Sequence, residues 1–227
     1  MVTQPTFRNR MLRISVLVVL IMFAFSAWAW FQLPADASVP VHWGINGQAN
    51  GYGGKAEGLL LMPTITLALS VLFYFLPRLD PKGENILRSG SAYRALWIVL
   101  LIFFLGMHTV TTLIALGVNL QINQFILPAI SVLMIVMGNY MGKVRQNYMM
   151  GIRTPWTLAN EEVWNKTHRL GGRLFVISGI LSLLASLFGP LIGLIVFGAS
   201  MSISVGWTVI YSYVTFTQIN KESTSNS

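Results

Sequence analysis

Six apolar stretches along the chain are long enough to cross a membrane as helices, which requires about 20 mostly apolar residues each. The first four comprise residues 12–31, 59–76, 95–118 and 125–141. The last tract, 174–216, is too long for one crossing, and Gly189-Pro190 is typical of a turn between two spans. We also expect the second span to end before Pro77. The pattern predicts an all-α integral membrane protein built as a bundle of six transmembrane helices.

Composition agrees with the pattern. Hydrophobic residues make up 54% of the 227 residues, charged residues only 10%, and the mean hydropathy is +0.64. These values exclude a disordered chain, a nucleic-acid-binding domain and an ordinary soluble enzyme. The chain has no cysteine, which excludes disulfides, thiolate zinc sites and a cysteine nucleophile. We expect no metal, no cofactor and no catalytic residue.

The basic residues predict the orientation in the membrane. With six spans, fourteen of the fifteen Lys and Arg residues fall in segments on one side, and only Lys55 falls on the other. Because basic loops stay in the cytoplasm, both termini and the loop 143–173 are expected there, with the loop 33–58 outside. This distribution also explains most of the net charge of +8 without direct binding of nucleic acid.

The outer loop has the pattern of a small β-structure. Apolar and other residues alternate from Val39 to Trp43, and Asn46-Gly47 and Asn50-Gly51 are both typical hairpin turns. We therefore expect a structured hairpin that acts as a rigid cap, as a surface for a peptide or lipid headgroup, or as both. Its candidate binding residues are Pro40, His42, Trp43, Gly47 and Lys55.

The cytoplasmic loop predicts a helix of its own. Pro155 interrupts any preceding helix, a new one is expected to begin near residues 157–160, and Gly171-Gly172 is expected to end it. We expect Trp164 to lie at the membrane interface and to share one helix face with Thr167 and His168. This interfacial helix is either a simple anchor or a docking surface for a cytoplasmic partner or for anionic lipids.

Few ionisable groups lie within the predicted spans. The absence of Asp and Glu from them argues against an ion-coupled transporter. His108 is the exception among the ionisable residues. We expect it to be a neutral side chain bonded to a backbone carbonyl or a neighbouring hydroxyl, and a binding spot or proton relay is the alternative.

Two motifs resemble a known family. The stretch from Gly151 to Leu158, followed by Glu162-Val163-Trp164 and Thr167-His168-Arg169, closely resembles the signature of the SdpI family of bacterial membrane proteins. The outer loop resembles DUF1648, a domain of unknown function that often precedes it. We divide the chain into a DUF1648-like region (1–94), an SdpI-like region (95–216) and a disordered tail (217–227).

The resemblance implies a plasma-membrane immunity protein that protects a bacterium against a secreted antimicrobial peptide. It further implies a second role in signalling, in which a cytoplasmic transcriptional repressor is captured at the membrane. The cytoplasmic binding residues it suggests lie in the motif loop. They are Arg145, Asn147, Arg153, Thr154, Pro155, Trp156, Thr157, Trp164 and His168.

A membrane enzyme or lipid-handling protein is the alternative function. Its phosphate-binding site would lie at the cytoplasmic interface and would use Arg145, Arg153 and His168, because arginine forks and a histidine base suit that chemistry. No acidic partner for His168 is evident from the spacing.

Overall fold

The computed structural model describes the backbone of residues 4–225 and the side chains of residues 7–222. The elements in chain order are α1 (Gln4–Gln32), β1 (Val39–Trp43), β2 (Ala49–Gly53), α2 (Lys55–Leu79), α3 (Gly83–Arg88), α4 (Gly90–Ala115), α5 (Asn123–Met141), α6 (Pro155–Ala159), α7 (Glu161–Ser186) and α8 (Pro190–Ser225).

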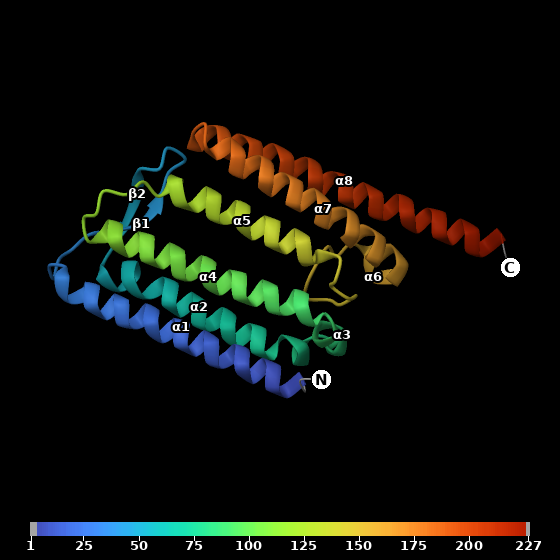
Figure 1. Cartoon of the computed structure of the whole chain (residues 1–227), viewed down its shortest axis with the longest axis horizontal. Helices are drawn as coiled ribbons and strands as arrows, with labels where there is room; N and C mark the ends of the chain where they lie inside the picture. The colour runs from blue at the N-terminus through green and yellow to red at the C-terminus, as the bar shows by residue number, and fades with distance from the viewer. Residues whose placement is uncertain (1–3, 226–227) are drawn as a thin grey trace.

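Six long helices run side by side in two groups, α1 with α2 and α4, and α5 with α7 and α8, joined where α4 packs on α5 (Figure 1). Within the described residues, these six are long and apolar enough to cross a membrane. The predicted six-span, all-α fold is therefore confirmed. The predicted turn is confirmed too, because Gly189 has a φ of +135° and Pro190 begins α8.

The two ends of the bundle differ. The β-hairpin lies at one end, called here the hairpin end (Figure 1). The start of α1, the end of α8 and the short helices α3 and α6 lie towards the other, called the motif end. A cytoplasmic motif end stays a prediction that rests on the basic residues.

Aromatic packing and buried hydrogen bonds hold the first helix group together. The rings of Phe73, Tyr93 and Trp97 lie 5.5–5.8 Å apart between centroids, and the indole N–H of Trp97 donates to Ser15 Oγ at 2.9 Å. His108 Nε2 lies 3.2 Å from Ser26 Oγ and 3.2 Å from the Met22 carbonyl oxygen. The expectation that His108 bonds a backbone carbonyl or a hydroxyl is confirmed.

Close backbone approach holds α5 against α7. A Cβ on Gly172 would lie 2.6 Å from the Gly138 carbonyl oxygen, and one on Gly138 would lie 2.6 Å from the Gly172 carbonyl oxygen. These glycines therefore serve helix packing, as small residues do in membrane bundles. The prediction that Gly171-Gly172 ends a separate interfacial helix is wrong, because α7 continues unbroken from Glu161 to Ser186.

Three local predictions also need correction. The second span does not end before Pro77, since α2 includes it and the next turn still closes with the N–H of Asp80 donating to the Leu76 carbonyl. The tail is not disordered from residue 217, because α8 continues its helical hydrogen bonding to Ser225, and residues 226–227 lie outside the described range. Asn50-Gly51 forms no turn and lies within β2.

The hairpin itself is confirmed. β1 pairs with β2 in antiparallel fashion, and the turn contains Gly47 at a φ of +78°. Val39 is buried against Gly58 of α2, where a Cβ would lie 2.2 Å from Val39 Cγ1. The side-chain amide of Asn123, at the start of α5, donates to the Ile45 carbonyl at 3.2 Å. The hairpin is thus fastened to both helix groups.

Candidate functional site

The family motif forms a folded segment at the motif end, residues 142–160, called here the motif segment. Four of its polar side chains point inward. Those that are buried, together with three side chains of the following helix, are Gln146, Asn147, Thr154, Thr157, Trp164, Thr167 and His168. Trp164, Thr167 and His168 do share one face, as predicted, but Trp164 is 0% exposed, so its predicted place at the membrane interface is wrong.

Asn147 organises the turn that begins the motif segment. Its Oδ1 accepts the backbone N–H groups of Met149 at 2.9 Å and Met150 at 2.6 Å, and its amide donates to the Arg145 carbonyl at 2.8 Å. An asparagine side chain can replace backbone partners in a tight turn in this way. Asn147 therefore determines the loop conformation and is not itself accessible to a ligand.

His168 and Trp164 form the floor under the motif segment. Their rings stack with centroids 3.9 Å apart. The backbone N–H of Ile152 donates to His168 Nε2 at 2.9 Å, so that nitrogen carries no proton, and Nδ1 donates to the Trp164 carbonyl at 2.8 Å. The indole N–H of Trp164 donates to the Val144 carbonyl at 2.7 Å.

Gly151 is required where the segment passes over this floor. Its φ is +106°, and a Cβ there would lie 2.3 Å from His168 Nε2. A side chain would therefore both strain the backbone and collide with the ring.

The Thr-Pro-Trp-Thr stretch of the motif begins α6. The N–H of Thr157 donates to Thr154 Oγ1 at 3.2 Å, and the N–H of Thr154 donates to Thr157 Oγ1 at 2.9 Å, which is a reciprocal cap around Pro155 at the first helical position. Thr154 Oγ1 also lies 3.2 Å from Ser212 Oγ, and the ring of Trp156 contacts Tyr213 at 5.1 Å, which ties the motif to α8.

Residues 80–89, in the first helix group, supply hydrogen-bond partners to the motif segment that the sequence did not predict. Asp80 is 5% exposed, and its carboxylate accepts the N–H groups of Lys82 at 2.6 Å and Tyr148 at 2.8 Å. Gln146 accepts from the Lys82 ammonium group and donates to the Thr157 carbonyl at 2.7 Å. No spacing in the sequence indicates pairs separated by more than 60 residues.

Further hydrogen bonds complete this connection. The amide of Asn85 donates to the Gln146 carbonyl at 2.8 Å, and the N–H of Arg145 donates to Ser89 Oγ at 2.9 Å. The motif segment is therefore fixed to both helix groups.

The charged groups of the motif point outward. Arg145 and Arg153 are exposed, and Arg153 Nη1 donates to the Tyr148 carbonyl at 2.5 Å. We call Arg145, Tyr148 and Arg153 the exposed motif face. The phosphate site considered from the sequence is not assembled, because His168 is 1% exposed and both of its ring nitrogens are engaged. Among the described residues, no three His, Asp or Glu side chains gather as metal ligands.

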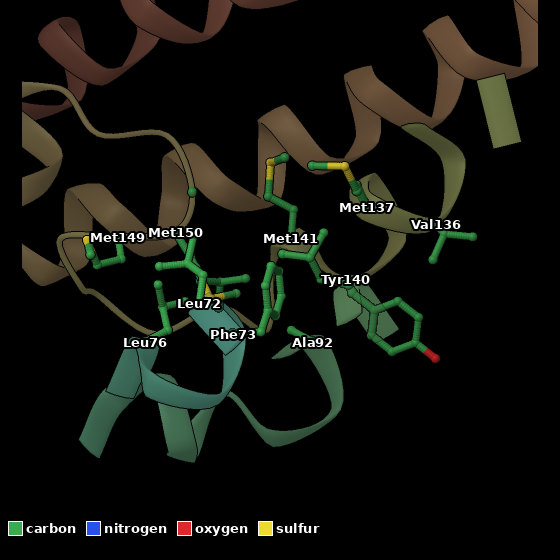
Figure 2. A pocket seen from close by; sticks show the side chains of 13 residues that line it. Leu72, Phe73, Leu76, Ala92, Val136, Met137, Tyr140, Met141, Met149 and Met150 are labelled. Carbon is green, nitrogen blue, oxygen red and sulfur yellow. The ribbon is translucent and has the colours of Figure 1, made fainter. Parts of the chain in front are cut away.

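An apolar cavity of about 310 Å³ lies between the motif segment and the helices α2, α4 and α5. Figure 2 shows methionine side chains around it, from α5 and from the motif segment. Those methionines are Met137, Met141, Met149 and Met150. Because methionine adapts to irregular partners, this methionine cavity can accommodate small rearrangements of the motif segment.

The predicted outer-loop residues do not converge on one site. His42 is exposed and its Nδ1 donates to Asn50 Oδ1 at 2.6 Å. The Lys55 ammonium donates to the Leu33 carbonyl at 3.0 Å and lies 4.9 Å from the centre of the Trp30 ring. Pro40 pairs with Tyr52 and Trp43 pairs with Ala49 across the strands, and Gly47 forms the turn. These contacts stiffen the hairpin.

Comparisons with known proteins agree with the two motifs. Residues 143–216 match the SdpI/YfhL protein family, and residues 17–77 match the domain of unknown function DUF1648. The chain is 28% identical over 176 residues to the immunity protein SdpI of Bacillus subtilis (strain 168), covering 77% of this chain and 81% of that protein. No solved structure matches the chain.

Proposed function

We propose that this chain, a multi-pass plasma-membrane protein whose residues 143–216 match the SdpI/YfhL protein family and whose residues 17–77 match DUF1648, confers immunity to a secreted antimicrobial peptide. The observation that carries the proposal is the similarity to an immunity protein over most of both chains. The action proposed is non-enzymatic, since His168, the one histidine of the motif, is buried and holds the loop in place.

The hairpin is the proposed site that meets the peptide or shields the lipid surface it attacks. Its strands and turn expose Val41, Ile45 and Tyr52, of which Ile45 is 68% exposed. Exposed apolar side chains on a hairpin fastened at Val39 and Asn123 lose little further freedom on binding, which favours contact with an amphipathic peptide.

This role requires the hairpin end to face the outside. The basic residues of α1, of the segment 78–94 and of the motif segment support that orientation. The chain has no native cysteine, so single cysteine substitutions can report this orientation. In intact cells, a membrane-impermeant maleimide should label Gln48→Cys in the hairpin turn and should label Lys143→Cys only after lysis. The opposite pattern would exclude contact between the hairpin and an external peptide.

The exposed motif face is the proposed docking site for a cytoplasmic partner, a transcriptional repressor with an acidic surface. The buried contacts of Asn147, Asp80 and His168 hold the backbone around Arg145 and Arg153 in a fixed conformation, which lowers the ordering cost of binding. Tagged repressors of the same bacterium should shift to the membrane fraction when the chain is present. The shift should disappear for Arg145→Ala/Arg153→Ala if the face is the site.

The direct test of immunity is expression in a peptide-sensitive strain. Cells that carry the wild-type chain should survive higher concentrations of the secreted peptide than cells with an empty vector. Membrane levels must be measured by immunoblot, so that absence of protection is not confused with absence of protein. Equal survival of the two strains, with the chain present in the membrane, would overturn the proposal.

A further inference from the structure

A second surface at the motif end is independent of the motif segment's hydrogen bonds. A groove of about 500 Å³ lies between α5 and α7. Gly138, Gly142 and Gly172 line its floor, where they leave space because they carry no side chain. Val176 and Ile177 line the part nearer the α7–α8 turn. Asn139, Arg169 and Arg173 line its polar part.

No acidic side chain among residues 7–222 pairs with the two arginines of this groove. Arg169 and Arg173 are both exposed and stand one helical turn apart on α7. Within residues 7–222, neither forms an ion pair or a side-chain hydrogen bond with the protein, and the same holds for hydrogen bonds of the Asn139 amide. Two guanidinium groups and an amide are thus free to donate to one anion.

Their position along α7 places them at the edge of the membrane. The uninterrupted apolar stretch from Leu174 to Ser186 rises only about 20 Å, whereas the hydrocarbon core of a bilayer is about 30 Å thick. If the α7–α8 turn lies at one edge of the hydrocarbon, the backbones of Arg173 and Arg169 lie only about 20 and 25 Å from it, just inside the opposite edge. An arginine at this depth requires water or an anion.

We propose that the groove binds one anionic phospholipid, with its phosphate on Arg169 and Arg173 and an acyl chain along Val176 and Ile177. Two features favour this ligand. The arginines complement the negative phosphate, and the groove is cationic near the membrane surface and apolar towards the centre of the membrane, as a phospholipid requires. The site goes beyond the immunity function, and it requires no antimicrobial peptide and no repressor.

The test measures lipid binding to the purified full chain in detergent, by native mass spectrometry. The probes are phosphatidylglycerol, phosphatidylcholine and inorganic phosphate. We expect phosphatidylglycerol to bind at least tenfold more tightly than phosphatidylcholine, and inorganic phosphate not to compete at equal concentration. Equal affinity for both lipids would overturn the proposal, and so would displacement of the lipid by free phosphate, because the acyl chain would then contribute nothing.

Two variants separate the charges from the groove. Arg169→Gln/Arg173→Gln removes both cations and should weaken phosphatidylglycerol binding about tenfold or more. Gly142→Leu keeps both cations but fills the groove, and the backbone accepts it because φ is −66° and the nearest atom to a Cβ, Arg169 Cγ, lies 3.5 Å away. It should weaken binding as well.

The matched control is Arg10→Gln/Arg13→Gln, an equal loss of charge on exposed positions of α1. It should bind phosphatidylglycerol as the wild type does, and Arg169→Lys/Arg173→Lys should retain part of the affinity. If the groove variants bind the lipid as tightly as this control does, the groove is not the site. Circular dichroism of every variant excludes unfolding as the cause of a loss.

Discussion

Replacement of Asn147 by alanine tests whether the motif segment is held by its buried polar side chains. Asn147 is 0% exposed, and its side chain makes three hydrogen bonds of 2.6–2.9 Å with backbone groups of Arg145, Met149 and Met150. Alanine removes all three bonds and offers nothing in their place. The turn then has two N–H groups and one carbonyl without their partners.

The magnitude follows from these three bonds. A buried hydrogen bond contributes about 0.5–1.5 kcal/mol net, and a polar group left unpaired costs about 1–3 kcal/mol. Relaxation of the loop towards water recovers part of the loss. We therefore expect Asn147→Ala to lower the free energy of unfolding by about 2–4 kcal/mol, which is large among single substitutions.

The assay is unfolding of the purified chain in mixed micelles, with increasing denaturing detergent and circular dichroism as the readout. Asn165→Ala is the matched control, because it makes the same chemical change at an exposed position of α7. The control should remain within about 0.5 kcal/mol of the wild type. If Asn147→Ala unfolds at the same detergent concentration as Asn165→Ala, the hydrogen bonds of the turn do not stabilise the motif segment.

Two further substitutions test the floor and the connection between the helix groups, by the same titration. Gly151→Ala should lower the free energy of unfolding by about 2 kcal/mol or more, because φ is positive there and the added Cβ collides with His168. Its control is Gly206→Ala on α8, which should leave the free energy of unfolding unchanged or raise it, because no atom lies within 4 Å of the added Cβ. Asp80→Asn should cost about 1.5–3 kcal/mol, since one of two charge-assisted bonds is lost, whereas the exposed Asp36→Asn should change little. If either variant unfolds at the same detergent concentration as its control, the structural reason given for its loss of stability is wrong.

The sequence was sufficient for the membrane fold because the bilayer requires long apolar helices. The spans, the turn at Gly189-Pro190 and the hairpin all follow from local patterns of hydrophobicity and turn residues. The prediction that a helix ends at Gly171-Gly172 is wrong. In the sequence, a glycine pair looks the same whether it ends a helix or allows a neighbouring helix to pack closely. Only the position of Gly138 on α5 distinguishes the two.

The motif was located by sequence, but the roles of its side chains were not. Trp164 and His168 looked suited to an interface or to binding, and both are buried in the floor of the segment. Their burial depends on Val144 and Ile152, which the fold brings over α7. The contribution of Asp80 depends on contact between distant parts of the chain, and no periodicity in one sequence encodes that contact.

The most direct test of the account compares survival curves of a peptide-sensitive strain carrying the wild-type chain, Ile45→Asp or Asn165→Ala at matched membrane levels. The account predicts that the wild type and Asn165→Ala protect equally and that Ile45→Asp protects less while remaining folded, because Ile45 is an exposed apolar side chain of the hairpin that meets the peptide. A wild-type chain that is present in the membrane and gives no protection would contradict the central claim.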